Sequence, residues 1–208
     1  MPATGSTTDY QRALLSFYEA HIDLGAAPIL HPVAFRARDT LPPFETVVLR
    51  APLVMDPGQP PLFLHATVAD SSRELGTSTG HEHQFVGIYE TDADELLRLV
   101  AAARHFDATV APLDHGHTCP LEERDDSALR RRGYTHVLLL GVDVFGSMIA
   151  SLESARDAMV NATPTRFLAV VPVTQEDMRL KLESGIGSVL CSWERQGRDP
   201  FTVLPLIA

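Results

Sequence analysis

Apolar residues occur along this chain in short runs of two kinds, and each kind predicts a different element. Runs in which apolar residues recur at helical spacing predict helices at residues 9–24, 91–105, 174–183 and 188–196. Compact or alternating apolar runs predict strands at residues 46–49, 62–68, 84–90, 134–144 and 167–173. The predicted order is helix, strands, helix, strands, two helices and an extended tail at residues 201–207.

Polar residues flank several of these runs in patterns typical of helix ends. Ser6 and Asp9 stand three residues apart ahead of the first helical run, which indicates a capped N-terminus. Thr174 and Asp177 show the same spacing directly after the last compact apolar run, and they predict a helix that begins there. Gly197 follows the final helical run and is expected to end it.

Turn-forming residues divide the chain into short elements and define the fold class. Fifteen prolines and thirteen glycines among 208 residues argue against a plain helix bundle. The length favours one domain, residues 1–208, over two very small ones. We therefore predict an α+β fold, with a mixed, largely antiparallel sheet and flanking helices in a single domain. The most apolar strand candidate, residues 134–144, is expected to be central in that sheet.

Charge is the strongest compositional signal. The chain has 17 Lys and Arg against 27 Asp and Glu, which gives a formal net charge of −10 at pH 7. A protein that binds a phosphate backbone needs the opposite field, so nucleic acid is a poor candidate for a direct partner. A basic protein is a good candidate.

Several features predict a cytoplasmic protein that does not cross a membrane. The N-terminal residues lack the basic and apolar regions of a signal peptide. The longest apolar stretch, residues 136–150, is interrupted by glycine and aspartate and is shorter than the roughly 20 apolar residues of a spanning helix. The two cysteines, Cys119 and Cys191, are too few for a disulfide framework and suit a reducing compartment.

Histidine is the residue type most suggestive of chemistry. Four of the nine histidines form two His-x-His pairs, His81 with His83 and His115 with His117. Residues two apart on a strand face the same side, so each pair offers two imidazoles to one metal. Both pairs lie in polar, glycine-containing segments (70–83 and 112–126) that are predicted to be exposed loops, and neither matches a known zinc spacing. We therefore predict no metal site and no cofactor, and we keep a metal-dependent enzyme as an alternative.

No other motif predicts catalysis. Cys119 follows two histidines, but catalytic Cys–His pairs are usually assembled from distant positions. No GxSxG elbow and no complete glycine-rich phosphate loop is present. The carboxylates occur in charged runs that are predicted to be solvated surface: Glu122, Glu123, Asp125, Asp126, Glu176, Asp177 and Glu183. We predict no catalytic residue and no enzymatic activity.

Two segments resemble a known family. Residues 167–190, FLAVVPVTQEDMRLKLESGIGSVL, are similar to the signature of suppressor-of-fused-like domains, in which an apolar strand ends in Val-Pro and an acidic helix leads to a second helix. The LDHGHT segment at 113–118 and the later strand HVLLLG resemble that family's Gly-His segment and Leu-rich strand. The matching segments span residues 110–190, with weaker likeness at 61–90, and the length suits the bacterial single-domain type.

The resemblance implies a binding protein without chemistry of its own. Animal members of the family sequester a transcription factor, and bacterial members are regarded as immunity proteins that neutralise a toxin. Together with the charge, this leads us to expect a cytoplasmic immunity protein that binds a cognate basic toxin, for example a nuclease. A regulator that sequesters an endogenous protein or peptide is the alternative. The expected partner-binding residues are acids of the two polar loops: Glu122, Glu123, Asp125, Asp126, Asp70 and Glu82.

Overall fold

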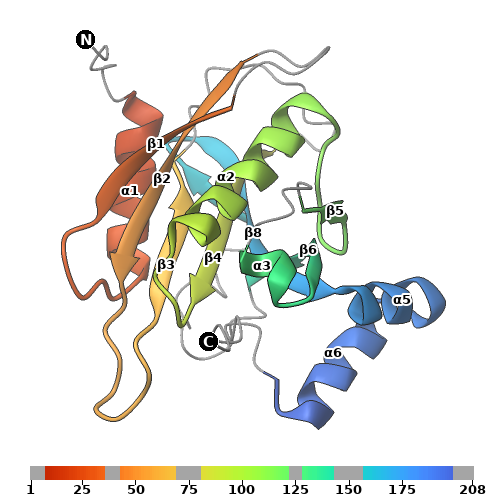
Figure 1. Cartoon of the computed structure of the whole chain (residues 1–208). Helices are drawn as coiled ribbons and strands as arrows, with labels where there is room; N and C mark the ends of the chain where they lie inside the picture. Colours follow the sequence, from red (N-terminus) through yellow and green to blue (C-terminus); the bar gives the residue numbers. More distant parts are fainter. Residues whose placement is uncertain (1–7, 36–42, 69–80, 122–127, 143–156, 199–208) are drawn as a thin grey trace.

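The structure is a computed structural model of the whole chain, and it describes residues 8–35, 43–68, 81–121, 128–142 and 157–198 (Figure 1). The helices are α1 (Asp9–His21), α2 (Asp94–Thr109), α3 (Ala128–Arg131), α5 (Gln175–Ser184) and α6 (Ile186–Gln196). The strands are β1 (Ile29–Phe35), β2 (Phe44–Pro52), β3 (Phe63–Thr67), β4 (Glu82–Tyr89), β5 (Thr118–Pro120), β6 (Tyr134–Gly141), β7 (Asp157–Val160) and β8 (Thr163–Thr174).

All of the described strands belong to one sheet. Its order is β1-β2-β3-β4-β8-β6-β5, and β7 pairs with β8 off this path. Strands β4 and β8 run parallel, whereas every other described pair is antiparallel. The predicted α+β fold with a mixed, largely antiparallel sheet and flanking helices is therefore confirmed.

Strand β8 joins the two halves of the sheet. It pairs with β4 on one side, through Thr165–Ala169, and with β6 and β7 on the other. Residues 167–173 of β8 are all buried, which explains why this segment is an almost continuous apolar run. Strand β6, which was predicted to be central, is an internal strand that lies between β8 and the edge strand β5. It is apolar because alternate residues of β6 enter two different hydrophobic clusters.

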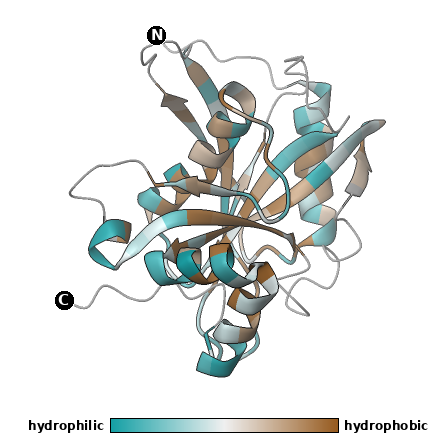
Figure 2. Cartoon of the chain, turned by 90° about the vertical axis from the view of Figure 1, so that its right-hand side faces the viewer, coloured by the Kyte–Doolittle hydropathy of each residue, from teal (hydrophilic) through white to brown (hydrophobic). Residues whose placement is uncertain are grey.

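The sheet is covered by helices on both faces, and each face has its own hydrophobic core (Figures 1 and 2). One core contains residues of α1, α5 and α6, among them Leu14, Tyr18 and Trp193. The other contains residues of α2 and α3, among them Val100 and Leu129. Burial of each large apolar side chain contributes about 1.5–3 kcal/mol. Among the described residues, no helix is long and apolar enough to cross a bilayer.

The predicted helix ends are confirmed for α5 and α6 and wrong for α1. The Thr174–Asp177 capping box is present as predicted, and α6 ends at Gly197 with a φ of 63°. The N-cap of α1 is Thr8, whose side chain accepts from the Gln11 N–H, so the predicted Ser6–Asp9 cap is wrong. Residues close to each other in sequence are enough to set these ends.

The structure adds two strands to the predicted elements and corrects one predicted loop residue. Residues 29–35, for which no element was predicted, form the edge strand β1. Pro32 is tolerated there because β1 is paired on one side only, so the missing N–H leaves no gap in the ladder. Strand β7 was missed; it joins β8 through Asn161 and Ala162, whose φ values of 47° and 61° suit a tight hairpin turn. His83, placed in an exposed loop, lies in β4 and is fully buried.

Candidate functional site

Four ionisable side chains from β4 and α2 form a buried ionic network, which consists of Glu82, His83, Arg104 and Asp107. Arg104 donates to Glu82 Oε1 at 2.5 Å and to Asp107 Oδ2 at 3.2 Å. His83 Nδ1 lies 2.9 Å from Asp107 Oδ1, and it donates because a carboxylate only accepts. Arg104 and Asp107 are 4% and 7% exposed, so their charges are tolerable only because they are paired.

Glu82 is the one expected partner-binding residue that the structure describes. Its carboxylate accepts from Arg104 and is half-buried at the start of β4. Burial raises the pKa of Glu82, and the neighbouring Asp107 raises it too, while Arg104 lowers it. The side chain is thus engaged inside the molecule, and its role toward a partner stays a prediction.

The buried ionic network also holds the segment that follows α2. Asp107 Oδ1 accepts from the backbone N–H of Leu113 at 2.8 Å. Leu113 is buried, and the DHGHT residues come directly after it. The carboxylate of Asp107 therefore links three partners, a guanidinium, an imidazole and a backbone amide, and it fixes where the next segment begins.

Residues 114–118 form a tight turn, which we name the 114–118 turn. The N–H of His117 donates to the Asp114 carbonyl at 3.0 Å, and the N–H of Asp114 donates back to His117 Nδ1 at 3.1 Å. Gly116 has a φ of 83°, in the region that favours glycine, and its N–H donates to the Leu139 carbonyl at 2.7 Å. The turn is thereby attached to β6.

The second His-x-His pair is used for this attachment. His115 Nδ1 accepts from the Gly141 N–H at 2.9 Å, and His117 Nδ1 accepts from Asp114. Each ring therefore carries its proton on Nε2 when neutral. Because both Nδ1 atoms hold backbone amides, these imidazoles have a structural purpose that needs no metal. Within the described ranges, no group of three His, Cys, Asp or Glu side chains is arranged to hold an ion.

An ion pair joins the turn to the centre of the sheet. Arg166 Nη1 on β8 donates to both oxygens of Asp114, at 3.1 and 3.0 Å, and Arg166 is the Cα partner of His83 on β4. Burial disfavours the ionised form of Asp114 and so raises its pKa. The His115 N–H and the Arg166 guanidinium lower the pKa by more, and they hold it below its usual range. The segments of the two His-x-His pairs, far apart in sequence, are thus brought together by Arg166.

Helices α5 and α6 lie beside this turn (Figure 1). Lys181 Nζ is 3.4 Å from Thr118 Oγ1, and a Cβ at Gly116 would lie 3.8 Å from Ile186 Cδ1. Leu182 on α5 is 78% exposed, and the side chains of His115 and His117 are exposed as well. The 114–118 turn and α5 therefore present a mixed polar and apolar surface on a firmly held backbone.

Asp177 is a buried structural residue that was predicted to be solvated, and this prediction is wrong. Its Oδ1 accepts from Trp193 Nε1 at 2.8 Å, and its Oδ2 accepts from Arg198 Nη1 and from the Thr174 N–H, each at 2.8 Å. Burial opposes ionisation of Asp177, yet these donors, with Arg198 foremost, lower its pKa. Only the Thr174 contact had a signal in the sequence, because the other two partners are 16 and 21 residues away.

Cys119 is unsuited to nucleophilic chemistry. It lies in β5 and is buried. Burial raises the pKa of its thiol to about 11, with Asp107 adding a smaller effect of the same sign. The thiol is therefore protonated at neutral pH, and the thiolate is the nucleophilic form. Cys191 is exposed on α6.

The remaining acids expected to contact a partner lie outside the described residues: Asp70, Glu122, Glu123, Asp125 and Asp126. In sequence, the last four stand between β5 and α3. Their role toward a partner stays a prediction. The described neighbours of the second segment, Leu121 and Leu129, are both buried.

Comparison with known proteins identifies the fold. No family model matches the chain, and no curated protein matches it. A solved suppressor of fused homolog from Neisseria gonorrhoeae FA 1090 is 16% identical, with a TM-score of 0.57 and 93% of each chain covered. Drosophila Suppressor of Fused is 12% identical, with a TM-score of 0.57, over 92% of this chain and 48% of that one. The chain in a Sufu–Fu complex is 13% identical, with a TM-score of 0.56, over 92% and 86%.

These likenesses confirm the resemblance that was predicted from residues 110–190, at the level of the fold. The chain has the suppressor-of-fused fold, and it spans about half the length of the Drosophila protein. The likeness extends over almost the whole chain, well beyond the segments that carried the prediction from sequence.

Proposed function

We propose that this protein is a non-enzymatic immunity protein that neutralises a basic toxin by direct protein–protein binding. The observation that carries the proposal is the net charge of −10. A toxin that acts on nucleic acid needs a positive surface to attract its substrate. Complementary fields speed the association of such a pair and disfavour wrong partners.

The fold and the local geometry support this proposal. One solved structure with the same fold is described as a complex, Sufu with Fu, so that protein holds a protein partner. In the present chain, the 114–118 turn is held by hydrogen bonds to β6 and by the Asp114–Arg166 ion pair. A surface that is already ordered loses little conformational entropy on binding, which favours tight association.

The direct test is co-expression with the product of the adjacent reading frame. We expect that product to stop growth when expressed alone and growth to recover when this protein is present. A matched variant replaces the acidic run by Glu122→Gln, Glu123→Gln, Asp125→Asn and Asp126→Asn without changing side-chain size. We expect its association rate with the purified product to fall by about tenfold or more, because steering by charge accelerates association by 10–10³-fold.

Two results would contradict the proposal. If the adjacent product is toxic and remains equally toxic beside this protein, neutralisation does not occur. If the association rate of the wild-type pair is insensitive to salt, charge does not guide binding.

Sequestration of an endogenous protein is the second candidate, and the Sufu–Fu complex favours it because a protein of this fold holds another protein there. The two candidates differ in genetic context: immunity predicts a toxin-like reading frame next to this gene, and sequestration predicts an isolated gene. The metal-dependent alternative predicts bound transition metal in the purified protein, which elemental analysis measures directly.

A further inference from the structure

Strand β1 is an edge strand whose outward backbone groups can be identified. Among the described strands, β1 pairs with β2 and with no other. The N–H of Val68 donates to the Val47 carbonyl at 2.7 Å, so the backbone groups of Val47 face β3. Pro32 is the Cα partner of Val47 and therefore occupies a non-hydrogen-bonded position, with its carbonyl directed away from β2.

The same alternation applies two residues before and after Pro32. Leu30 and Ala34 share its phase, so their N–H and C=O groups also point away from β2. We name these three residues, Leu30, Pro32 and Ala34, the β1 edge. Natural edge strands are commonly protected by lysine or by other charges. The sequence of β1, ILHPVAF, contains no Lys, Arg, Asp or Glu.

The side chains along this edge are apolar and exposed. Leu30 is 40% exposed and the adjacent Ile29 is 60% exposed, and Pro32 and Ala34 are exposed as well. Leu30, Pro32 and Ala34 share one face of the sheet with their partners Leu49, Val47 and Glu45. An added strand would therefore meet both backbone groups that no described strand pairs with and apolar side chains.

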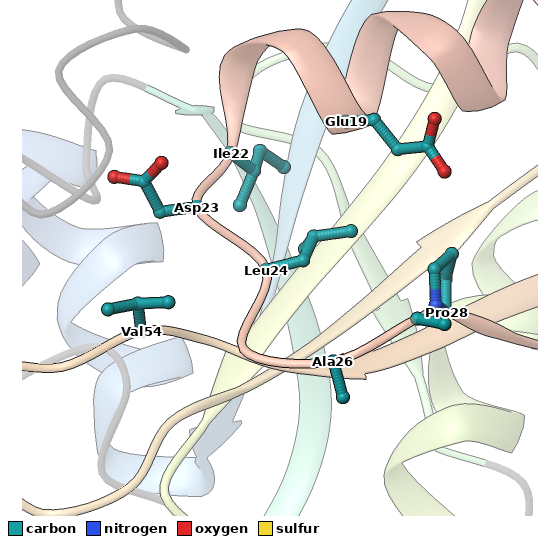
Figure 3. A pocket seen from close by; sticks show the side chains of 8 residues that line it. Glu19, Ile22, Asp23, Leu24, Ala26, Pro28 and Val54 are labelled. Carbon is teal, nitrogen blue, oxygen red and sulfur yellow. The ribbon is translucent and has the colours of Figure 1, made fainter.

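A shallow depression of about 360 Å³ lies at the start of β1 (Figure 3). Glu19 of α1 points toward the end of the depression at Pro28, and Asp23 lies at the other end, beside Val54. Leu24 lies between the two carboxylates. Both acids are exposed, and Glu45 is exposed on β2 beside Ala34. Acidic side chains therefore flank the apolar contacts at the start of β1 and beside Ala34.

The charge distinguishes between possible occupants. A second copy of this chain would place two edges with the same acids, on molecules of net charge −10, against each other. Like charges in such a position repel. An extended segment with basic side chains would meet opposite charges at Glu19, Asp23 and Glu45 instead. Main-chain hydrogen bonds give such strand addition its affinity, and alternate side chains give it specificity.

We propose that the β1 edge binds an extended, basic segment of the protein partner as an added strand. The Lys or Arg side chains of that segment would lie near Glu19 and Asp23, and its apolar side chains would lie on Leu30 and Pro32. This inference rests on the proposed function, because it assigns a contact surface for the basic partner. That surface is at the opposite edge of the sheet from β5 and the 114–118 turn.

The probe is a short blocked peptide of the repeat Lys-Thr-Val-Thr, which places lysine and valine on the same face of an added strand, as Leu30 and the acids require. We expect it to bind weakly, with hydrogen exchange slowed at the amides of Leu30 and Ala34 and chemical shifts changed along β1. The same peptide with glutamate in place of lysine controls for charge. The lysine peptide with alternate amides methylated controls for the main-chain ladder, and we expect neither control to bind.

Two variants test the edge and the acids separately. Ala34→Pro removes an outward N–H at a position of the same phase as the natural Pro32, so β1 keeps its bonds to β2 and binding of the peptide falls. Glu19→Gln with Asp23→Asn is expected to weaken binding by about twofold to thirtyfold, since two exposed ion pairs are lost. Thermal melting checks that both variants remain folded.

Each outcome decides the inference. Absence of binding at millimolar peptide, or protection at β5 or α6 instead of β1, overturns it. A dimer in solution that Ala34→Pro dissociates also overturns it, because the edge is then occupied by a second copy. If the toxin is neutralised but binds the Ala34→Pro variant equally well, this inference fails and the proposed function stands. If the peptide binds β1 while no toxin is neutralised, the proposed function fails.

Discussion

The indole Nε1 of Trp193 donates a hydrogen bond to Oδ1 of Asp177, and this bond ties helix α6 to the first turn of helix α5. The same carboxylate caps α5 through Thr174 and pairs with Arg198. The Arg198 guanidinium lies 4.6 Å from the centre of the Trp193 ring, at cation–π distance. One buried aspartate therefore holds both C-terminal helices to the end of β8.

Replacement of Asp177 by alanine is expected to destabilise the protein strongly. Asp177→Ala leaves the Trp193 N–H and the Arg198 charge without their acceptor, and breaking a buried pair of this kind costs about 3–5 kcal/mol. Urea unfolding followed by tryptophan fluorescence measures the change, since Trp193 is the single tryptophan. A loss below about 1 kcal/mol would show that the carboxylate is dispensable.

Asp177→Asn is the matched control, because it keeps the size and the carbonyl oxygen but removes the charge. The pKa of Asp177 is lowered in the folded protein, so its charge contributes stability above the unfolded pKa of about 3.9, and this is lost as pH falls through the folded pKa. We expect the wild type to exceed Asp177→Asn in stability at neutral pH and the difference to shrink in acid. A difference that is constant with pH would contradict this assignment.

His65 makes the stability depend on pH in a higher range. It is fully buried beside Tyr89, and burial lowers its pKa to about 4, against smaller raising effects of Asp92. The unfolded state takes up the proton first, near pH 6.5, so stability is complete above about pH 6.5 and is lost progressively toward pH 4. Between about pH 7 and 5 the wild type should lose about 2 kcal/mol through this residue.

The test is His65→Leu, which removes the titrating group from the same buried position. We expect unfolding free energies of the variant to vary less between about pH 7 and 5 than those of the wild type, by that same amount of about 2 kcal/mol. Equal slopes for the two proteins would show that another group is responsible.

Glycine is required at position 87 because the side chain of Tyr89, two residues later on β4, fills the space beside its Cα. A Cβ at Gly87 would lie 2.4 Å from Tyr89 Oη, and that hydroxyl donates to the Val170 carbonyl at 2.8 Å. Tyr89 is fully buried and cannot move aside, so Gly87→Ala is expected to cost about 1–3 kcal/mol or more by overpacking. Thermal unfolding measures it.

A double-mutant cycle isolates this contact. Gly87→Ala should cost much less in a Tyr89→Leu background, because the obstructing ring is absent there. If the alanine is equally harmful in both backgrounds, the effect comes from the strand backbone and not from Tyr89.

Asp107 is expected to control the order of the 114–118 turn. Asp107→Ala removes the acceptor of His83, Arg104 and the Leu113 amide together, at a cost of about 3–5 kcal/mol. Hydrogen exchange at the amides of Gly116 and Leu139 should accelerate more in this variant than exchange in β2. Thr109→Ser near the same end of α2 is a matched control that keeps its bond to the His105 carbonyl, and it should leave both regions unchanged.

The features predicted from sequence are those that depend on near neighbours. The apolar run of β8 and the Thr174–Asp177 spacing are sufficient to predict a buried strand and a capped helix, and both are present. Strand β1 was missed because proline is unfavourable in a strand that is paired on both sides. Pro32 is accommodated here because β1 pairs with β2 on one side only.

The buried polar residues were missed for a related reason. His83 follows a polar segment, and its burial depends on Asp107, which is 24 residues away. Asp177 stands among exposed acids, and its indole partner is 16 residues away. Nothing local distinguishes a carboxylate with such a partner from a solvated one. The sequence therefore predicts the fold class well and the buried polar contacts poorly.

The parallel β4–β8 pair has a consequence for how the protein is made on the ribosome. Strands β1 to β4 pair with their sequence neighbours and can assemble as soon as they emerge. Strand β8 is separated from β4 by α2, β5, α3, β6 and β7, so its pairing with β4 has a large loop-closure entropy. A nascent chain that ends before Thr163 therefore carries β4 with one unpaired side, and during synthesis it needs protection from self-association until β8 emerges.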